Sequence, residues 1–218
     1  MDHKSINNLN IIKNEVVSEN QSINIIAVTK TFPIDVIDPL LKGGHIHYGE
    51  NKVQEAIEKW SIIKPQYKNI KLHMIGKLQS NKVKFILPLF DYIHSLDNQK
   101  LAEKISQEQI KKQFKPKIFI QVNIGNEIQK SGIDKKDLKL FYKSCVENYN
   151  LDIIGLMCIP PDSIDSNAYF QEMLELKKEL GLKELSMGMS NDYIQAVKNG
   201  ATYIRIGSKI FGERTNKF

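Results

Sequence analysis

Short apolar runs alternate with longer amphipathic stretches along almost the whole chain. The short runs are rich in strand-forming residues, whereas the longer stretches repeat apolar residues at the three- and four-residue spacing of a helix. We expect strands near residues 25–30, 45–49, 71–75, 91–96, 117–124, 151–159, 184–188 and 202–206. We expect helices around residues 5–19, 34–42, 51–63, 79–88, 98–112, 134–149, 166–180 and 191–199.

This alternation predicts a parallel sheet, because parallel strands must be joined by crossover connections. Eight strand and helix units within 218 residues favour a closed (β/α)8 TIM barrel over an open doubly wound sheet. The helix over 5–19 comes before the first strand and is additional to the barrel. The prediction is one α/β domain over residues 1–218 with an extra N-terminal helix.

Composition narrows the range of partners. The net charge is +6, but the lysines are mixed with acidic residues on helix-like stretches, which is typical of solvated helix faces. No basic run is interleaved with aromatic residues, so nucleic acid is not an expected partner. No apolar run approaches the length of a membrane span, and Cys145 and Cys158 have no metal-binding or CxxC spacing. We therefore expect a cytoplasmic protein without a membrane partner.

Polar residues gather just after the predicted strands, where parallel barrels carry their functional groups. Lys30 ends the first strand on the same face as Ile26 and Val28, which predicts an inward-pointing amine. An amine in apolar surroundings near another cation has a lowered pKa, and the neutral form attacks aldehydes. For a lone lysine, a side chain that extends to solvent at the rim is the better interpretation.

Arg205 favours the functional interpretation of Lys30, because a second charged residue lies in the middle of the apolar eighth strand. A buried guanidinium needs acceptors, either an internal carboxylate or a ring nitrogen of a bound cofactor. Gly207 and Ser208 follow strand eight, and Ser190 follows strand seven, where loops commonly cradle a phosphate. Each short segment alone would be an ordinary turn. Together with Lys30, they predict a site for a molecule with a phosphate, an aldehyde and an aromatic nitrogen.

Two further groups of residues stay open to other interpretations. Asn51, within the segment 49–55, either reaches into the barrel mouth or only belongs to a strand end and helix start favoured by the helix dipole. Histidines at 45, 47, 73 and 94 suggest a metal site, but strands five to eight offer no clustered carboxylates to complete it. Packed, hydrogen-bonded histidines are the better interpretation, and no metal is expected.

Several longer motifs follow one another in a distinctive order. They are Ala-Val-Thr-Lys-Thr at 27–31, Tyr-Gly-Glu-Asn at 48–51 with Gln-Glu at 54–55, His-Met-Ile-Gly-Lys-Leu-Gln-Ser-Asn-Lys at 73–82, Lys-Ser-Gly at 130–132, Gly-Leu-Met at 155–157, Leu-Ser-Met-Gly-Met-Ser at 185–190, and Arg-Ile-Gly-Ser at 205–208 with Phe-Gly-Glu-Arg at 211–214. Over nearly its whole length, the chain resembles the YggS/PROSC family of pyridoxal phosphate homeostasis proteins.

The resemblance implies a fold-type III barrel, like the N-terminal domain of alanine racemase but without that enzyme's additional β domain. It implies that Lys30 holds pyridoxal 5′-phosphate (PLP) as a Schiff base, that Arg205 faces the pyridine nitrogen, and that Ser190, Gly207 and Ser208 hold the phosphate. Together with the strand-end residues, the expected cofactor-binding set is Lys30, Asn51, Met187, Ser190, Arg205, Gly207 and Ser208. No catalytic residue is assigned.

Four positions depart from the usual family pattern. The family usually has Ser at Thr29, Thr at Ser208, Lys at Phe32 and Pro at Lys77. Thr29 and Ser208 keep a hydroxyl, so their function should persist, whereas Phe32 and Lys77 should alter the rim of the pocket.

An arginine at the pyridine nitrogen leaves that nitrogen unprotonated and weakens the cofactor as an electron sink. The leading hypothesis is therefore a PLP-binding homeostasis protein with little or no turnover, a monomer, with apo forms of PLP-dependent enzymes as candidate recipients. The alternative is a fold-type III amino-acid racemase, with Tyr48 and Tyr203 as candidates for a second acid/base. A cofactor-free Schiff-base aldolase would also explain Lys30 but leaves Arg205 without a role.

Overall fold

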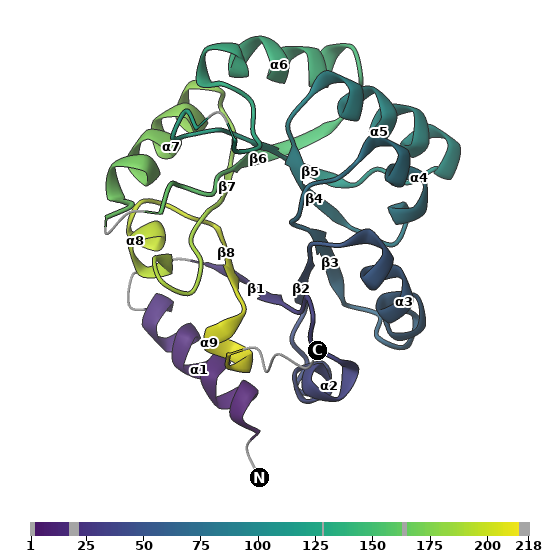
Figure 1. Cartoon of the computed structure of the whole chain (residues 1–218), viewed down its shortest axis with the longest axis vertical. Helices are drawn as coiled ribbons and strands as arrows, with labels where there is room; N and C mark the ends of the chain where they lie inside the picture. The colour runs from purple at the N-terminus through teal and green to yellow at the C-terminus, as the bar shows by residue number, and fades with distance from the viewer. Residues whose placement is uncertain (1–2, 18–21, 128, 163–164, 214–218) are drawn as a thin grey trace.

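The structure is a computed structural model that describes residues 3–17, 22–127, 129–162 and 165–213. Eight parallel strands close into a barrel in the order β1 to β8, and helices surround it (Figure 1). The strands are β1 Asn24–Val28, β2 His47–Glu50, β3 Lys71–Met74, β4 Tyr92–Leu96, β5 Lys117–Gln121, β6 Asp152–Met157, β7 Glu184–Ser186 and β8 Tyr203–Ile206. The predicted closed α/β barrel is confirmed.

The helices mostly fill the predicted crossovers. They are α1 Lys4–Val17, α2 Ile34–Lys42, α3 Val53–Ile63, α4 Val83–Ile86, α5 Gln99–Lys112, α6 Lys135–Glu147, α7 Asn167–Glu179, α8 Tyr193–Lys198 and α9 Ser208–Phe211, with 3-10 turns at Lys64–Gln66 and Ser80–Lys82. The helix expected over 79–88 is instead a 3-10 turn followed by the short α4. Its early end fits Pro88, because the residue before a proline avoids the helical conformation.

Pairing between the first and last strands closes the barrel. Asn24 pairs with Tyr203 and Ala27 pairs with Ile206, both in a parallel register. Along β1 the side chains alternate, since Ile25 and Ala27 belong to the large outer core under the helices, whereas Ile26 belongs to a small core inside the barrel. This alternation turns every second residue of a strand toward the barrel axis.

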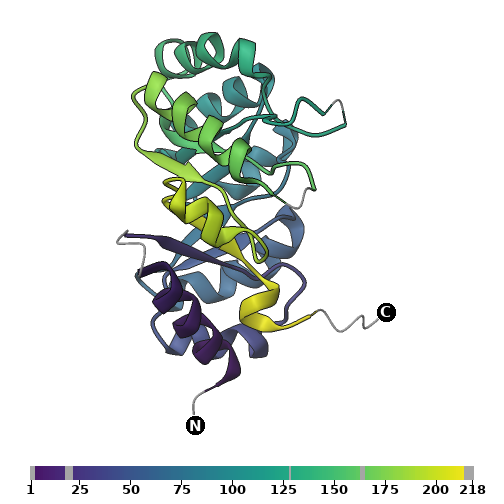
Figure 2. The same ribbon diagram turned by 90° about the vertical axis from the view of Figure 1, so that its left-hand side faces the viewer.

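The N-terminal helix α1 lies beside α9, at the other end of the chain (Figures 1 and 2). Leu9, Ile12 and Val16 form its buried face. The side-chain amide of Asn8 donates to the carbonyl of Ile210 at 3.0 Å. Helix α1 therefore supports the segment that follows β8. The last two residues of the helix expected over 5–19 lie outside the described residues.

Among the described residues, no helix combines the length and the apolar character that crossing a bilayer requires.

Candidate functional site

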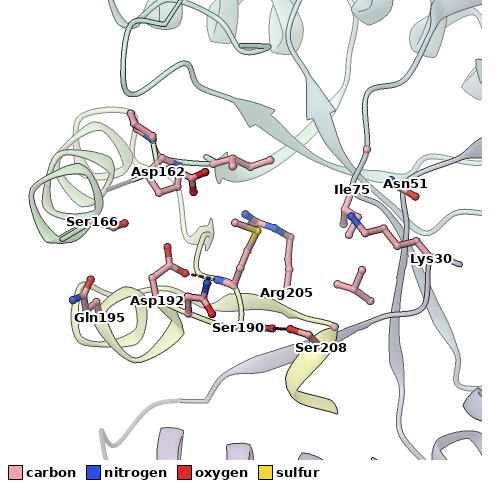
Figure 3. A pocket seen from close by; sticks show the side chains of 18 of the residues that line it. Lys30, Asn51, Ile75, Asp162, Ser166, Ser190, Asp192, Gln195, Arg205 and Ser208 are labelled. Atoms are coloured by element: carbon pink, nitrogen blue, oxygen red, sulfur yellow. Dashed lines mark hydrogen bonds between the residues drawn. The ribbon is translucent and has the colours of Figure 1, made fainter. Parts of the chain in front are cut away.

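A cavity of about 570 Å³ opens where the strands end (Figure 3). Its lining residues lie at or after the carboxyl ends of β1, β2, β3, β6, β7 and β8. Six of the seven predicted cofactor-binding residues line it: Lys30, Asn51, Ser190, Arg205, Gly207 and Ser208. The seventh, Met187, is fully buried in the outer core and is not among the lining residues. Side chains from the first and last strands are thus brought to one cavity.

The backbone turns sharply after Lys30. Thr31 has a φ of 67°, which is an uncommon conformation for a β-branched residue and marks local strain. The Thr31 amide donates to Oε1 of Glu55 at 2.5 Å, and the Thr29 hydroxyl donates to Oε1 of Glu50 at 2.7 Å. Hydrogen bonds on both sides of Lys30 therefore hold the turn that directs its side chain into the cavity.

Glu50 is the centre of a buried polar cluster that includes Thr29, the residue before Lys30. Its Oε1 accepts hydrogen bonds from Thr29 Oγ1, from Lys59 Nζ at 3.0 Å and from Trp60 Nε1 at 3.0 Å. Lys59 Nζ also donates to the Thr29 carbonyl at 2.9 Å. The carboxylate is fully buried, so it depends on these partners. The motif at 48–55 therefore does more than start a helix: Glu50 holds Thr29, the residue before Lys30, while Asn51 lines the cavity.

Arg205 is also buried, with 4% of its surface exposed. Its Nη1 donates to Ser186 Oγ at 2.8 Å and its Nη2 donates to the Cys158 carbonyl at 2.8 Å. Burial lowers the pKa of Arg205, although a guanidinium stays protonated in proteins. Within the described part of the chain, Arg205 makes no ion pair with a carboxylate, and its Nε has no hydrogen-bond partner. The internal carboxylate considered from the sequence is therefore not what holds the guanidinium.

Two hydroxyls meet on the lower side of the cavity in Figure 3. Ser208 Oγ donates to Ser190 Oγ at 3.0 Å, which joins the loops after β7 and β8. The loop after β7 is held by the Met189 amide, which donates to Asp192 Oδ1 at 2.6 Å. Exposed hydroxyls next to the start of α9 are suited to an anion, since both can rotate to donate to it.

The opposite wall of the cavity was not expected from the sequence. It comes from the segment after β6, including Pro160, Pro161 and Asp162, and from Asp192 and Gln195 near α8. Figure 3 shows Asp162 and Ser166 across the cavity from Lys30. The two consecutive prolines directly after a strand were a usable signal, because they mark the start of a loop at a strand end.

Three other residues at or near the ends of strands do not line this cavity. Ser95 and Met157 are buried, and Asn123 lines a separate cavity with Lys130. Two positions that differ from the family pattern were expected to alter the rim of the pocket. Phe32 lines the main cavity, and its ring lies 4.9 Å from the ring of Phe211 between centroids. Lys77 is exposed and does not line the cavity.

The histidines are hydrogen-bonded, as expected, rather than gathered around a metal position. His47, His73 and His94 bond ring to ring, and His45 bonds to the His47 carbonyl. The described residues contain no group of three or more His, Cys, Asp or Glu arranged to hold a metal.

The two tyrosines considered as a second acid/base are buried and do not line the cavity. Burial raises the pKa of Tyr48 and of Tyr203. Neither hydroxyl is therefore placed to exchange a proton with a molecule in the cavity.

Comparison with known proteins gives consistent results. The chain matches the family model described as alanine racemase, N-terminal domain, over residues 4–215. It is 38% identical to a pyridoxal phosphate homeostasis protein of Aquifex aeolicus over 87% of this chain and 86% of that protein. The structure of PipY from Synechococcus elongatus without PLP has 33% identity and a TM-score of 0.87, covering 96% of this chain and 100% of PipY. The structure of PipY with PLP bound has 34% identity and a TM-score of 0.80, and the match covers 92% of this chain and 100% of PipY.

Proposed function

Because the chain belongs to the alanine racemase N-terminal domain family and, within it, to the pyridoxal phosphate homeostasis proteins, we propose that it binds PLP in the barrel-mouth cavity. In this proposal, residues 1–218 form one binding domain that holds PLP covalently through Lys30. The protein stores or delivers the vitamin B6 cofactor and has little or no turnover of amino acids. The relative PipY has a structure with PLP bound, which supports the choice of ligand.

The observation that carries the proposal is that an amine, a guanidinium and a pair of hydroxyls line one cavity. Lys30, Arg205, Ser190 and Ser208 come from strands at opposite ends of the sequence, and barrel closure brings them together. These groups match the aldehyde, the pyridine nitrogen and the phosphate of PLP. The fit extends to hydrogen bonding, because the buried Arg205 keeps a donor, Nε, without a partner among the described residues.

Bound PLP supplies an aldehyde that condenses with primary amines. In the cavity, the Lys30 side chain provides that amine, and it is the only lysine among the lining residues that the structure describes. Arg205 orients the ring by donating to its nitrogen, and the charged guanidinium keeps that nitrogen unprotonated. Ser190, Gly207 and Ser208 hold the phosphate, while Asn51 borders the cavity near Lys30 (Figure 3).

The residues that line the cavity support the proposal of low turnover. Racemisation needs an acid/base on each face of the substrate. Within the described residues, the cavity lining contains no tyrosine, histidine or cysteine, and its only carboxylates are Asp162 and Asp192. The chemistry that remains is reversible binding of an aldehyde by an amine. We further propose a cytoplasmic monomer that releases PLP to apo forms of PLP-dependent enzymes.

The test is an absorbance measurement followed by attachment mapping. After reconstitution with PLP, the protein should show a near-visible band, and borohydride reduction followed by peptide mapping should place the label on Lys30. Lys30→Ala should lose the band and the label. Lys77→Ala is the matched control, because Lys77 is exposed and lies outside the cavity lining. Labelling of another lysine, or no band in the parent protein, would refute the proposal.

The homeostasis role is tested separately from binding. A panel of L-amino acids should show no conversion at ordinary enzymatic rates of roughly 1–10³ per second. Conversion at such rates by the PLP-loaded protein, lost in Lys30→Ala, would replace the carrier role by an enzymatic one without affecting the ligand assignment.

A further inference from the structure

A continuous series of hydrogen bonds runs through the barrel interior and ends at Arg205. His47 Nδ1 and His73 Nε2 are 2.9 Å apart, His73 Nδ1 and His94 Nε2 are 2.9 Å apart, and His94 Nδ1 is 2.9 Å from Ser186 Oγ. Arg205 Nη1 donates to the same Ser186 oxygen at 2.8 Å. We refer to His47, His73, His94 and Ser186 as the histidine chain.

The histidine chain connects the two ends of the barrel. His47 is the first residue of β2 and is only partly buried, so it lies at the end of the barrel opposite the cavity. His73 and His94 are fully buried, and their rings stack on Tyr92 and Phe119 at centroid distances of 4.2 Å. Ser186 is fully buried at the end of β7. The chain therefore passes from a partly solvated position to a residue that lines the cavity.

The three rings are neutral near pH 7. Burial lowers the pKa of His47 to about 4, and Lys71 lowers it further while Asp91 opposes the shift. Burial also lowers the pKa of His73 and of His94 well below 6.5, with His94 lowered further by Arg205. A neutral imidazole has one nitrogen that donates and one that accepts. Each link in the chain therefore sets the direction of the next link.

A donor at one end of the series, Arg205, and an acceptor at the other end, His47, together set its direction. A guanidinium can only donate, so it occupies one lone pair of the Ser186 oxygen. If His94 also donated to Ser186, the buried serine hydrogen would have no acceptor among the described residues. If Ser186 donates to His94 Nδ1 instead, the hydroxyl hydrogen of Ser186 and the ring N–H groups of His94 and His73 all have acceptors. His94 Nε2 then donates to His73, and His73 Nε2 donates to His47.

We propose that the histidine chain is a positioning device for Arg205, in which His47, His73 and His94 all carry their proton on Nε2. The three histidines fix the orientation of the Ser186 hydroxyl. That hydroxyl in turn fixes the orientation of the Arg205 guanidinium, which borders the cavity. His47, His73, His94 and Ser186 are thus positioning residues for the pyridine ring. The part of the inference that concerns the ring rests on the proposed function.

The first test needs no ligand. Nitrogen-15 NMR of histidine-labelled protein at pH 7 should show a protonated Nε2 and an unprotonated Nδ1 for all three rings. His47→Leu removes the last acceptor, so a second tautomer should appear at His94, two links away. His47→Asn keeps an oxygen acceptor and should restore the single tautomer. His45→Gln, outside the ring-to-ring series, should leave His94 unchanged. Protonation on Nδ1 in the parent protein, or no response of His94 to His47→Leu, would overturn the proposal.

The second test measures PLP binding. Ser186→Ala should raise the dissociation constant for PLP about tenfold, the equivalent of ~1.4 kcal/mol. It should also shift the absorbance maximum of the bound ligand. Ser95→Ala is the matched control, because Ser95 is also a buried serine, but its hydroxyl has no hydrogen-bond partner among the described residues. Unchanged affinity and spectrum in Ser186→Ala would overturn the positioning role while leaving PLP binding intact. Absence of PLP binding in the parent would instead refute the proposed function, and the ligand-free NMR result would still decide the ring tautomers.

Discussion

Single residues in this protein are constrained most tightly where loops close around the cavity. Gly188 follows β7 and has a φ of 90°, which a side chain rarely adopts. A Cβ built on it would lie 2.6 Å from the Cβ of Ala196 in α8. Gly188 therefore brings the loop that carries Ser190 close to α8 in a way that no other residue type permits.

We predict that Gly188→Ala destabilises the protein by about 3 kcal/mol, because backbone strain and a steric clash add. Gly181→Ala is a matched control, since its φ is 64° but a Cβ there would meet nothing within 4 Å. That control should cost about 1 kcal/mol, from the backbone conformation alone. Urea unfolding of both variants measures the difference. Equal losses would show that α8 moves aside without cost.

Some cavity-lining residues could be predicted from the sequence and others could not. Lys30 and Arg205 were recognisable because each breaks an apolar strand pattern at a strand end or centre. Met187 belongs to the same motif as Ser190, yet it is fully buried in the outer core. The motif does not reveal which of its residues face the cavity, because β7 ends at Ser186 and the direction of each later side chain depends on the loop.

At the scale of elements, the buried ion pair between Glu50 and Lys59 joins β1, β2 and α3. Lys59 Nζ reaches both the Glu50 carboxylate and the carbonyl of Thr29, so the pair couples helix α3 to the segment after β1 that carries Lys30. Both side chains are buried. Removing one partner leaves a charge in the interior without its counterpart.

We predict that Glu50→Gln lowers the free energy of unfolding by about 3 kcal/mol and weakens PLP binding. The double variant Glu50→Gln with Lys59→Met should recover part of the loss, because it removes the unpaired charge. Asp38→Asn is the control, since it breaks the surface pair with Lys42, and solvent screening leaves such an exposed pair little effect on stability. Denaturant unfolding and PLP titration measure the two effects. A loss for Glu50→Gln no larger than for Asp38→Asn would contradict the coupling.

Element type and order were predictable because strands and helices have different apolar periods. Element ends were less so: the strand expected to run to residue 124 stops at Gln121, and the one expected to run to 188 stops at Ser186. In both cases the chain leaves the sheet to form loops, one of which lines the main cavity. The apolar pattern does not reveal the residue at which a strand ends, because apolar residues such as Val122 stay buried beyond that residue.

At the scale of the whole molecule, barrel closure creates relations that no local pattern contains. The cavity wall formed by Pro160, Asp162 and Gln195 lies opposite Lys30 only because β1 pairs with β8. The histidines are a second example. The strand predicted over 45–49 includes both His45 and His47, but β2 begins at His47. The ring-to-ring bonds take one histidine from each of three neighbouring strands.

Those buried histidines give the whole fold a predictable response to acid. Burial lowers the pKa of His45 and of His47 to about 4, and lowers the pKa of His73 and of His94 well below 6.5. In the unfolded chain they titrate near pH 6.5. Between these values the unfolded chain binds protons that the folded protein does not, so the free energy of unfolding decreases as the pH falls.

We predict a slope of about 1.4 kcal/mol per pH unit for each such histidine below pH 6.5, measured by urea unfolding from pH 7 to pH 5. His94→Gln should reduce the total slope by about that amount, because glutamine takes up no proton in either state. The slope separates this effect from a general loss of stability in the variant. A general loss would lower the free energy of unfolding by the same amount at every pH and leave the slope unchanged. An unfolding free energy that stays constant from pH 7 to pH 5 would mean that the barrel interior accommodates the protonated rings.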